Sequence, residues 1–260
     1  MRETPGNEIP RRTVLAAGAG VAGASAFALG AATPAQAAGN RYFKHGVASG
    51  DPYPDSVVLW TRVTPTAAAT PGSGRGPAVT VRWQVARDRA FRRVVRQGTF
   101  RTTARRDHTV KVEADRLRPG TTYYYRFLLD GVASRVGRTR TAPAPDASPS
   151  RLRFGVVSCA NLQAGWFTAY RHLAKRDDLD AVLHLGDYLY EYAPGEYGYG
   201  QSNEDVRKHV PAREMVSLGD YRKRHAQYKR DADLQDLHAK YPFIVTWDDH
   251  EVTNDQYENG

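Results

Sequence analysis

The chain has 260 residues and a formal net charge of +9 at pH 7. It contains no helix-turn-helix, zinc-finger or ribonucleoprotein motif, so its basic character does not indicate specific nucleic-acid recognition. Its single cysteine excludes an intrachain disulfide, and the fold must therefore depend on its hydrophobic core.

The first predicted element is an export signal at residues 1–37. Arg11 and Arg12 precede an apolar stretch rich in Ala and Gly, residues 14–32, and Ala35-Gln36-Ala37 forms a small-x-small cleavage site. This order predicts a twin-arginine signal peptide that is cleaved after its last alanine. A transmembrane helix is the alternative, but Ala and Gly have small transfer energies and no stop signal follows. We therefore expect the twin-arginine machinery to export the protein to the extracellular space, cell wall or periplasm.

A β-sandwich is predicted for residues 40–141. Alternating apolar and polar positions, separated by Pro- and Gly-rich turns, predict strands at 57–63, 79–85, 94–100, 109–112, 122–128 and 134–139. The turn and tyrosine-bearing strand at residues 117–125 resemble those of fibronectin type III modules. Residues 142–151 are rich in Pro, Ala and Ser and predict an interdomain linker.

Strands alternate with helices in residues 152–260, which indicates a parallel α/β sheet. The expected strands are 152–158, 181–185 and 243–246, and the expected helices are 166–175 and 218–239. The polar segment between Glu191 and Pro211 is too long for an ordinary connection, so we expect it to be a functional loop.

Charge is unevenly distributed along the chain. Residues 40–150 carry a net charge of +12 (20 Lys and Arg, 8 Asp and Glu), whereas residues 151–260 carry −4 (14 and 18). Two interpretations stay open. In the first, the basic sandwich attracts phosphorylated cell-wall polymers or anionic lipid. In the second, its arginines are ordinary solvent-exposed surface residues without a binding role.

Three predicted strands end in residue types that bind metals. Cys159 follows the first strand, Asp187 and Tyr190 follow the second, and Asp249 and His250 follow the third. The carboxyl ends of parallel strands meet at one edge of a sheet, where α/β proteins bind their ligands. A carboxylate at such a turn can bridge two metals for phosphoryl transfer.

The donor types favour particular cations. Thiolate and phenolate ligands at Cys159 and Tyr190 favour Fe³⁺ over Zn²⁺ or Mg²⁺. Asn254 and Asp255 offer oxygen ligands to a hard cation such as Ca²⁺. We expect His250 to assist the leaving group.

Each assignment has an alternative. Cys159 can be a small buried hydrophobe, and the Asp-Asp-His-Glu stretch can be a solvated loop, although the apolar run before it indicates a strand end. We expect His184 in the core or beside the site, and His172, His209, His225 and His238 on the surface because they lack ligand spacing.

Five segments together resemble the PhoD-type alkaline phosphatases. They are Val47-Ala48-Ser49-Gly50-Asp51-Pro52, residues 55–62, Ser158-Cys159, residues 184–192 and Thr246-Trp247-Asp248-Asp249-His250-Glu251-Val252. The resemblance implies a multi-domain protein in which a fibronectin-like β-sandwich precedes an αββα metallophosphoesterase domain that holds Fe³⁺ and Ca²⁺. It implies that Cys159, Asp187 and Tyr190 bind Fe³⁺, that Asp187 bridges to Ca²⁺, that Asp249 is a further ligand and that His250 lies near the phosphate.

The resemblance covers the N-terminal portion of the proteins of that family. Further ligands normally come from later strand ends, so we expect residues 152–260 to form only the first part of the αββα domain, with unpaired edges and an open core. We expect the 260-residue chain alone to be inactive.

The predicted function is that of an exported, monomeric phosphoesterase that acts on phosphate monoesters and diesters. In this prediction a metal-bound hydroxide or oxide attacks phosphorus in line. A phospholipase D-like diesterase on the same scaffold is one alternative, and a non-catalytic module that binds anionic cell-wall polymers is another.

Overall fold

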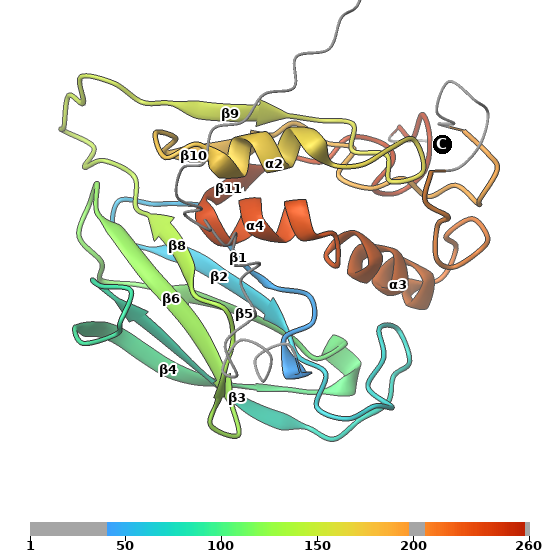
Figure 1. Cartoon of the computed structure of the whole chain (residues 1–260), viewed down its shortest axis with the longest axis horizontal. Coiled ribbons are helices and arrows are strands. Elements are labelled where there is room, and N and C mark those ends of the chain that lie inside the picture. Colours follow the sequence, from blue (N-terminus) through green and yellow to red (C-terminus); the bar gives the residue numbers. More distant parts are fainter. Residues whose placement is uncertain (1–40, 198–205, 258–260) are drawn as a thin grey trace, which may run out of the picture. The chain divides into compact units, whose positions relative to one another are not determined.

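The computed structural model describes residues 41–197 and 206–257 (Figure 1). The predicted signal peptide lies outside the described residues. Among the helices in the described residues, none has the length and apolar character needed to cross a membrane.

A six-stranded mixed sheet contains strands from both predicted domains. Its order is β5-β2-β1-β11-β10-β9. The strands from the first half of the chain are β1 (Val47–Gly50), β2 (Val57–Arg62) and β5 (Thr109–Ala114), and those from the second half are β9 (Phe154–Val157), β10 (Ala181–His184) and β11 (Pro242–Val245). The first three pair antiparallel, and the last three pair parallel as predicted.

The two halves meet where β1 and β11 pair in parallel, with Ser49 opposite Pro242 and Gly50 opposite Phe243. The Phe243 carbonyl also accepts a hydrogen bond of 3.0 Å from the Asp51 N–H. A Cβ atom on Gly50 would lie 2.9 Å from that same carbonyl oxygen, so the close approach requires glycine. No predicted strand corresponds to β1, yet it joins the two halves of the sheet.

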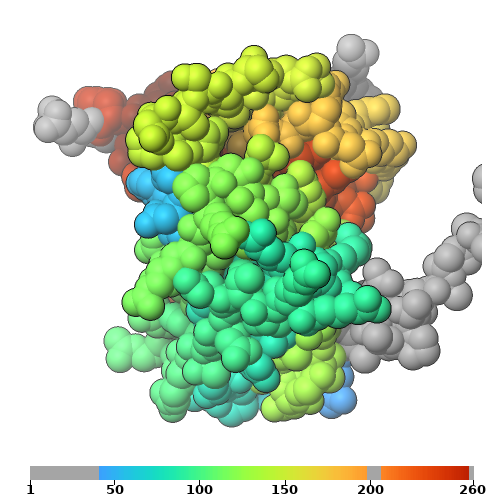
Figure 2. Space-filling view, turned by 90° about the vertical axis from the view of Figure 1, so that its left-hand side faces the viewer, coloured from blue at the N-terminus to red at the C-terminus, as the bar shows by residue number. Residues whose placement is uncertain are grey.

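The predicted linker contains no helix or strand, and residues 145–152 are exposed on the molecular surface, in yellow-green in Figure 2. The segments on either side of it nevertheless share the six-stranded sheet. Residues 142–151 therefore separate two stretches of chain without separating their hydrogen-bonded structure.

A second sheet completes the sandwich. It has the order β4-β3-β6-β7, and β8 also pairs with β6. Its strands are β3 (Val79–Ala86), β4 (Val94–Thr102), β6 (Thr122–Leu129), β7 (Val132–Ala133) and β8 (Gly137–Arg140), and a 3₁₀ helix (Ala104–Arg106) precedes β5. Buried Leu59 of β2 joins Val81 and Phe127 of this sheet in one hydrophobic core. The predicted β-sandwich is therefore present, with β1 as an additional strand.

Three helices pack with β9, β10 and β11 around a second core, which includes Val182, Tyr228, Leu237 and Phe243. They are α2 (Thr168–Lys175), α3 (Leu218–Tyr228) and α4 (Ala232–Lys240). The single helix predicted at 218–239 is wrong, because the Asp231 carboxylate caps a new helix by accepting a 2.9 Å hydrogen bond from Leu234 N–H.

Large apolar side chains remain exposed along β9 and β11. They are Phe154, Val156, Ile244 and Val245, and Trp247 beyond β11 is 73% exposed. These side chains leave part of the apolar surface of the sheet exposed to solvent.

Replacing Gly50 with Ala tests how much stability the pairing of β1 with β11 provides. The new Cβ would press on the backbone carbonyl of Phe243, so we expect the free energy of unfolding in urea to fall by about 1–3 kcal/mol. The matched control is Gly165→Ala, where a Cβ meets no atom within 4 Å and stability should stay the same or rise by up to about 1 kcal/mol. Equal effects of the two substitutions would contradict this role of Gly50.

Candidate metal centre

The three predicted strand ends come together. Ligand atoms of Asp187, Asp249 and His250 all lie within 4.8 Å of one another, and we call these three residues the strand-end cluster. The end of β9 is tied to the end of β10, because Cys159 N–H donates to the Gly186 carbonyl (3.3 Å) and Ala160 N–H donates to the Asp187 carbonyl (2.8 Å).

The backbone at these strand ends turns tightly. Gly186 has a φ of +103°, and a Cβ there would lie 2.5 Å from the backbone nitrogen of Asp248. Cys159 and Asp187 also have positive φ values, of 55° and 51°. Such conformations are costly for residues other than glycine and often occur at functional sites. They bring the loop after β10 against the loop after β11.

Asp187 is buried and only partly satisfied. Its Oδ2 accepts a 2.9 Å hydrogen bond from the Tyr190 hydroxyl, whereas its buried Oδ1 has no hydrogen-bond partner among the described residues. A buried acceptor without a partner is energetically costly. A cation coordinated by Oδ1 would remove that cost, so the geometry of Asp187 fits a metal ligand.

The surroundings of Tyr190 disfavour its ionisation when no cation is present. Burial, the Asp187 carboxylate and the Cys159 thiol all raise the pKa of the Tyr190 phenol. Cys159 is exposed, so it is not the buried hydrophobe of the alternative interpretation. Cys159 is not part of the strand-end cluster, although its thiol is close enough to Tyr190 to raise the pKa of the phenol.

His250 is oriented by a buried carboxylate. Its Nδ1 lies 3.0 Å from Glu191 Oε2, and Glu191 is only 1% exposed. The other oxygen, Oε1, accepts a 2.7 Å hydrogen bond from Asn254 N–H. Nδ1 is thereby engaged, so Nε2 is the ring nitrogen left for proton exchange with a substrate.

Three tyrosines surround the same imidazole. The ring centroids of Tyr190, Tyr192 and Tyr197 lie 4.2, 5.5 and 5.6 Å from that of His250. Tyr197 is 55% exposed, so this aromatic wall extends from the strand-end cluster to the solvent.

Glu251 fastens the two loops to each other. Its Oε2 accepts hydrogen bonds from the backbone N–H groups of Asp187 (3.2 Å) and Asp248 (3.0 Å), and its Oε1 accepts one from Tyr188 N–H. The position of Asp187 therefore depends on a residue beside His250.

The structure brings the predicted site residues together to different degrees. Asp187, Asp249 and His250 form the strand-end cluster, and Tyr190 bonds to it directly. Asn254 is exposed, and its side-chain amide donates to Asp255 Oδ2 (2.8 Å), so Asn254 enters the site through its backbone N–H.

Sequence patterns did not identify the roles of Glu191, Glu251 and Arg224. The two glutamates lie next to predicted ligands but carry no spacing signal of their own. Arg224 of α3 is buried and donates to the Tyr190 carbonyl, and burial lowers its pKa to about 10. It holds the backbone of the loop in which Tyr190 lies.

The histidine predictions were partly right. His184 is in the core, where its Nε2 lies 3.1 Å from the Tyr170 hydroxyl. His209 and His238 were predicted at the surface but are buried, because tyrosine hydroxyls of the second core hydrogen-bond to their ring nitrogens at 3.0 and 2.8 Å.

Two family models match the chain. The PhoD-like phosphatase model matches residues 154–260, and the model of the PhoD-like phosphatase N-terminal domain matches residues 29–143. Together they span most of the described residues, and their boundary falls in the predicted linker.

Individual relatives agree with these matches. Alkaline phosphatase D of Bacillus subtilis (strain 168) is 51% identical over 215 residues, which are 82% of this chain and 36% of that protein. A solved structure of PhoD matches with a TM-score of 0.77 and 49% identity, and covers 82% of this chain and 40% of that one. The chain thus spans less than half the length of either relative.

A human fibronectin type III domain matches with a TM-score of only 0.28 and 14% identity, over 45% of this chain and 85% of that one. A score that low does not bear on the fold, so the fibronectin-like character of the sandwich stays a prediction. The two family models and both close relatives agree, and the chain therefore belongs to the PhoD-like phosphatase family, whose N-terminal portion it matches.

Proposed function

We propose that the whole protein is an exported, metal-dependent phosphoesterase that hydrolyses phosphate monoesters and diesters. The observation that carries this proposal is the convergence of Asp187, Asp249 and His250 at one sheet edge in a chain of the PhoD-like phosphatase family. The unpartnered Oδ1 of Asp187 adds support, because it is a buried acceptor with no protein donor in the described structure.

Cys159, Asp187 and Tyr190 would hold Fe³⁺. Asp187 would be shared with Ca²⁺, and Asp249 would be a further ligand. Once bound, these cations would neutralise phosphoryl oxygens and lower the pKa of the attacking water. Asn254 would add its side-chain oxygen only after its amide leaves Asp255.

The protein's own side chains would position the substrate and move one proton. Glu191 holds His250 through Nδ1, so Nε2 would give a proton to the leaving oxygen. Tyr192 and Tyr197 flank the ring and would pack against the organic part of the ester. Cell-wall polymers and phospholipids are candidate sources of such esters, and the protein would act as a monomer.

Removing a proposed ligand should abolish activity. In the whole protein we expect Cys159→Ala and Asp187→Ala each to lower kcat/KM for an aryl phosphate monoester by about 100-fold or more, because even outer partners of metal ligands contribute 10- to 100-fold. Asp248→Asn is the matched control, since this carboxylate is exposed beside the cluster and its loss should leave activity unchanged. Full activity in both alanine variants would refute the ligand assignment.

The same assay separates the alternatives. A preference for phosphatidylcholine over aryl monoesters and bis-esters would favour the phospholipase D-like diesterase. Binding to cell-wall polymer without hydrolysis of any of these esters would favour the non-catalytic module.

Visible absorption tests the identity of the metal. Phenolate bound to Fe³⁺ absorbs visible light, so the iron-loaded protein should be pink to violet, and Tyr190→Phe should remove the band. Tyr192→Phe is the control, because Tyr192 lies beside His250 but is not a proposed ligand. A colourless active protein that contains zinc and no iron would contradict the ferric assignment.

Export is tested by the paired arginines. We expect Arg11→Lys together with Arg12→Lys to retain the protein in the cytoplasm with residues 1–37 uncleaved, because the twin-arginine route depends on this pair. N-terminal sequencing of the secreted and cytoplasmic fractions measures both effects. Unchanged secretion of the double variant would exclude this route.

A further inference from the structure

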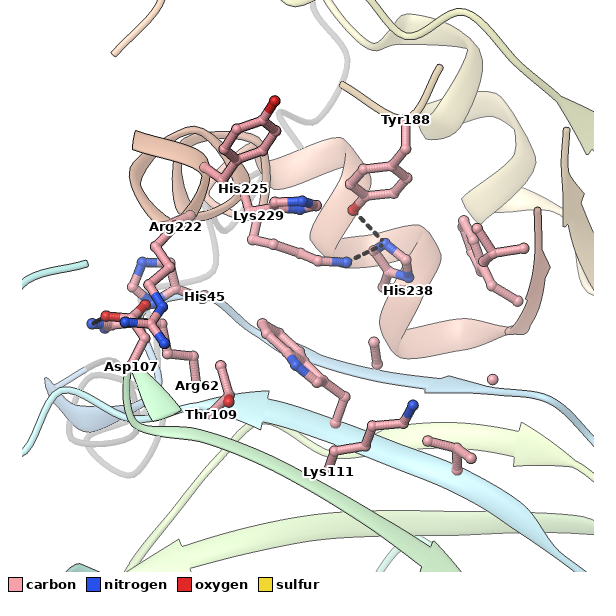
Figure 3. Close-up of a pocket in the computed structure, with 18 of the residues that line it drawn as sticks. His45, Arg62, Asp107, Thr109, Lys111, Tyr188, Arg222, His225, Lys229 and His238 are labelled. Carbon is pink, nitrogen blue, oxygen red and sulfur yellow. Dashed lines mark hydrogen bonds and ion pairs between the residues drawn. The ribbon is translucent and has the colours of Figure 1, made fainter. Parts of the chain in front are cut away.

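A large cavity lies apart from the strand-end cluster, between α3 and the β1, β2 and β5 part of the sheet (Figure 3). Its volume is about 1110 Å³, which is comparable with the largest ordinary small-molecule sites. Asp187, Asp249 and His250 do not line it, although Tyr188 and Glu251 do. The cavity is therefore a neighbour of the strand-end cluster and not a part of it.

The lining of this cavity is cationic. Six lysine and arginine side chains contribute to it. Arg62 is paired with Asp107, and the other five are Arg105, Arg106, Lys111, Arg222 and Lys229. In the part of the chain that the structure describes, none of these five forms an ion pair with a carboxylate. The positive charge that faces the cavity is thus not neutralised by the lining itself.

The acidic residues of the lining are engaged elsewhere or lie at its surface. Asp107 forms a buried ion pair with Arg62 (2.9 Å) and accepts a 2.8 Å hydrogen bond from Gly72 N–H. Glu251 accepts hydrogen bonds from three backbone N–H groups, and Asp51 is exposed. An anion that enters the cavity would meet basic groups that have no competing carboxylate.

Lys229 contacts a histidine and two aromatic rings of the lining. Its ammonium donates to His238 Nε2 at 3.0 Å, and it lies 5.1 Å from the ring centroid of Trp60 and 4.6 Å from that of Tyr188. Burial lowers the pKa of Lys229 to about 7. The side chain is half-buried, because one side of it borders the cavity.

The histidines around Lys229 do not balance its charge. Burial lowers the pKa of His238 well below its usual value, so this ring is neutral, and His225 is exposed. A partly buried ammonium that contacts only neutral groups loses part of its hydration, and an oxyanion would offset that loss.

We propose that this cavity binds a phosphate ester without hydrolysing it. Lys229, with Lys111 and Arg222 on the cavity walls (Figure 3), would pair with the phosphate, and the rings of Trp60 and Tyr188 would pack against the organic group. The volume is much larger than one inorganic phosphate requires, which favours an ester. This site is independent of the proposed catalytic function, because it uses none of the proposed metal ligands.

The test uses phenylphosphonate as the probe. Its carbon–phosphorus bond is not an ester, so phosphoesterases do not hydrolyse it. Isothermal titration of the metal-free protein should show binding in the parent and equally in Asp187→Ala, which disables the strand-end cluster. Lys229→Met should weaken binding by about tenfold or more, the contribution of one charged hydrogen bond.

Lys175→Met is the matched control. Lys175 is an exposed lysine of α2 that does not line the cavity, so this variant should bind as the parent does. Thermal melting checks that Lys229→Met is folded, and Lys111→Met serves as the second variant if it is not.

Three results would overturn the proposal. One is no binding of phenylphosphonate at millimolar concentration. Another is binding that Asp187→Ala removes and Lys229→Met preserves, which would place the anion at the strand-end cluster. The third is inorganic phosphate binding as tightly as phenylphosphonate, which would contradict the need for an organic group.

Discussion

The parallel pairing of β1 with β11 is the interaction on which the rest of the structure depends. It makes one sheet out of strands from both halves of the chain. The sandwich core and the helix-covered core are therefore both built on this sheet. The pairing relies on the absence of a side chain at Gly50, because the carbonyl of Phe243 occupies the space of a Cβ. The strand that leads to Asp249 and His250 therefore has a partner on each side, β10 and β1.

Buried carboxylates then convert these strand ends into a defined site. Glu251 joins the loop after β10 to the loop after β11 through backbone N–H groups, and Glu191 fixes the imidazole of His250. Each carboxylate lies on one loop and bonds to the other, so the two loops restrain each other. A metal site needs this kind of preorganisation, because loss of the groups that orient its ligands lowers metal affinity and activity.

Local sequence patterns predicted the strand ends but not their supporting partners. Asp187 and Asp249 follow apolar runs that are long enough to indicate a buried strand. The change from polar residues to such a run is visible in the local sequence and predicts where the strand lies. β1 was missed because Val47–Gly50 is short and pairs with two strands distant in sequence. The sequence did not predict that Glu191 orients His250, because the two residues are distant in sequence and meet only in the folded chain.

The same limit applies to the helices. The apolar period continues across Lys229 and Asp231, which led to the prediction of one helix, but the Asp231 side chain competes with the helical hydrogen bonds and starts α4 anew. Whether His238 and Lys229 face solvent or a tyrosine depends on how α3 and α4 pack, and periodicity within one helix does not determine that.

The continuous sheet also constrains how the chain folds. Ser49 pairs with Pro242 in the parallel pair. Nearly all of the described chain therefore has to be synthesised before β1 can pair with β11. Closing so long a loop costs conformational entropy and slows folding. The pairing of β1 with β11 therefore forms after the pairing of β1 with β2 becomes possible, and it is this late pairing that joins the sandwich to the candidate metal centre.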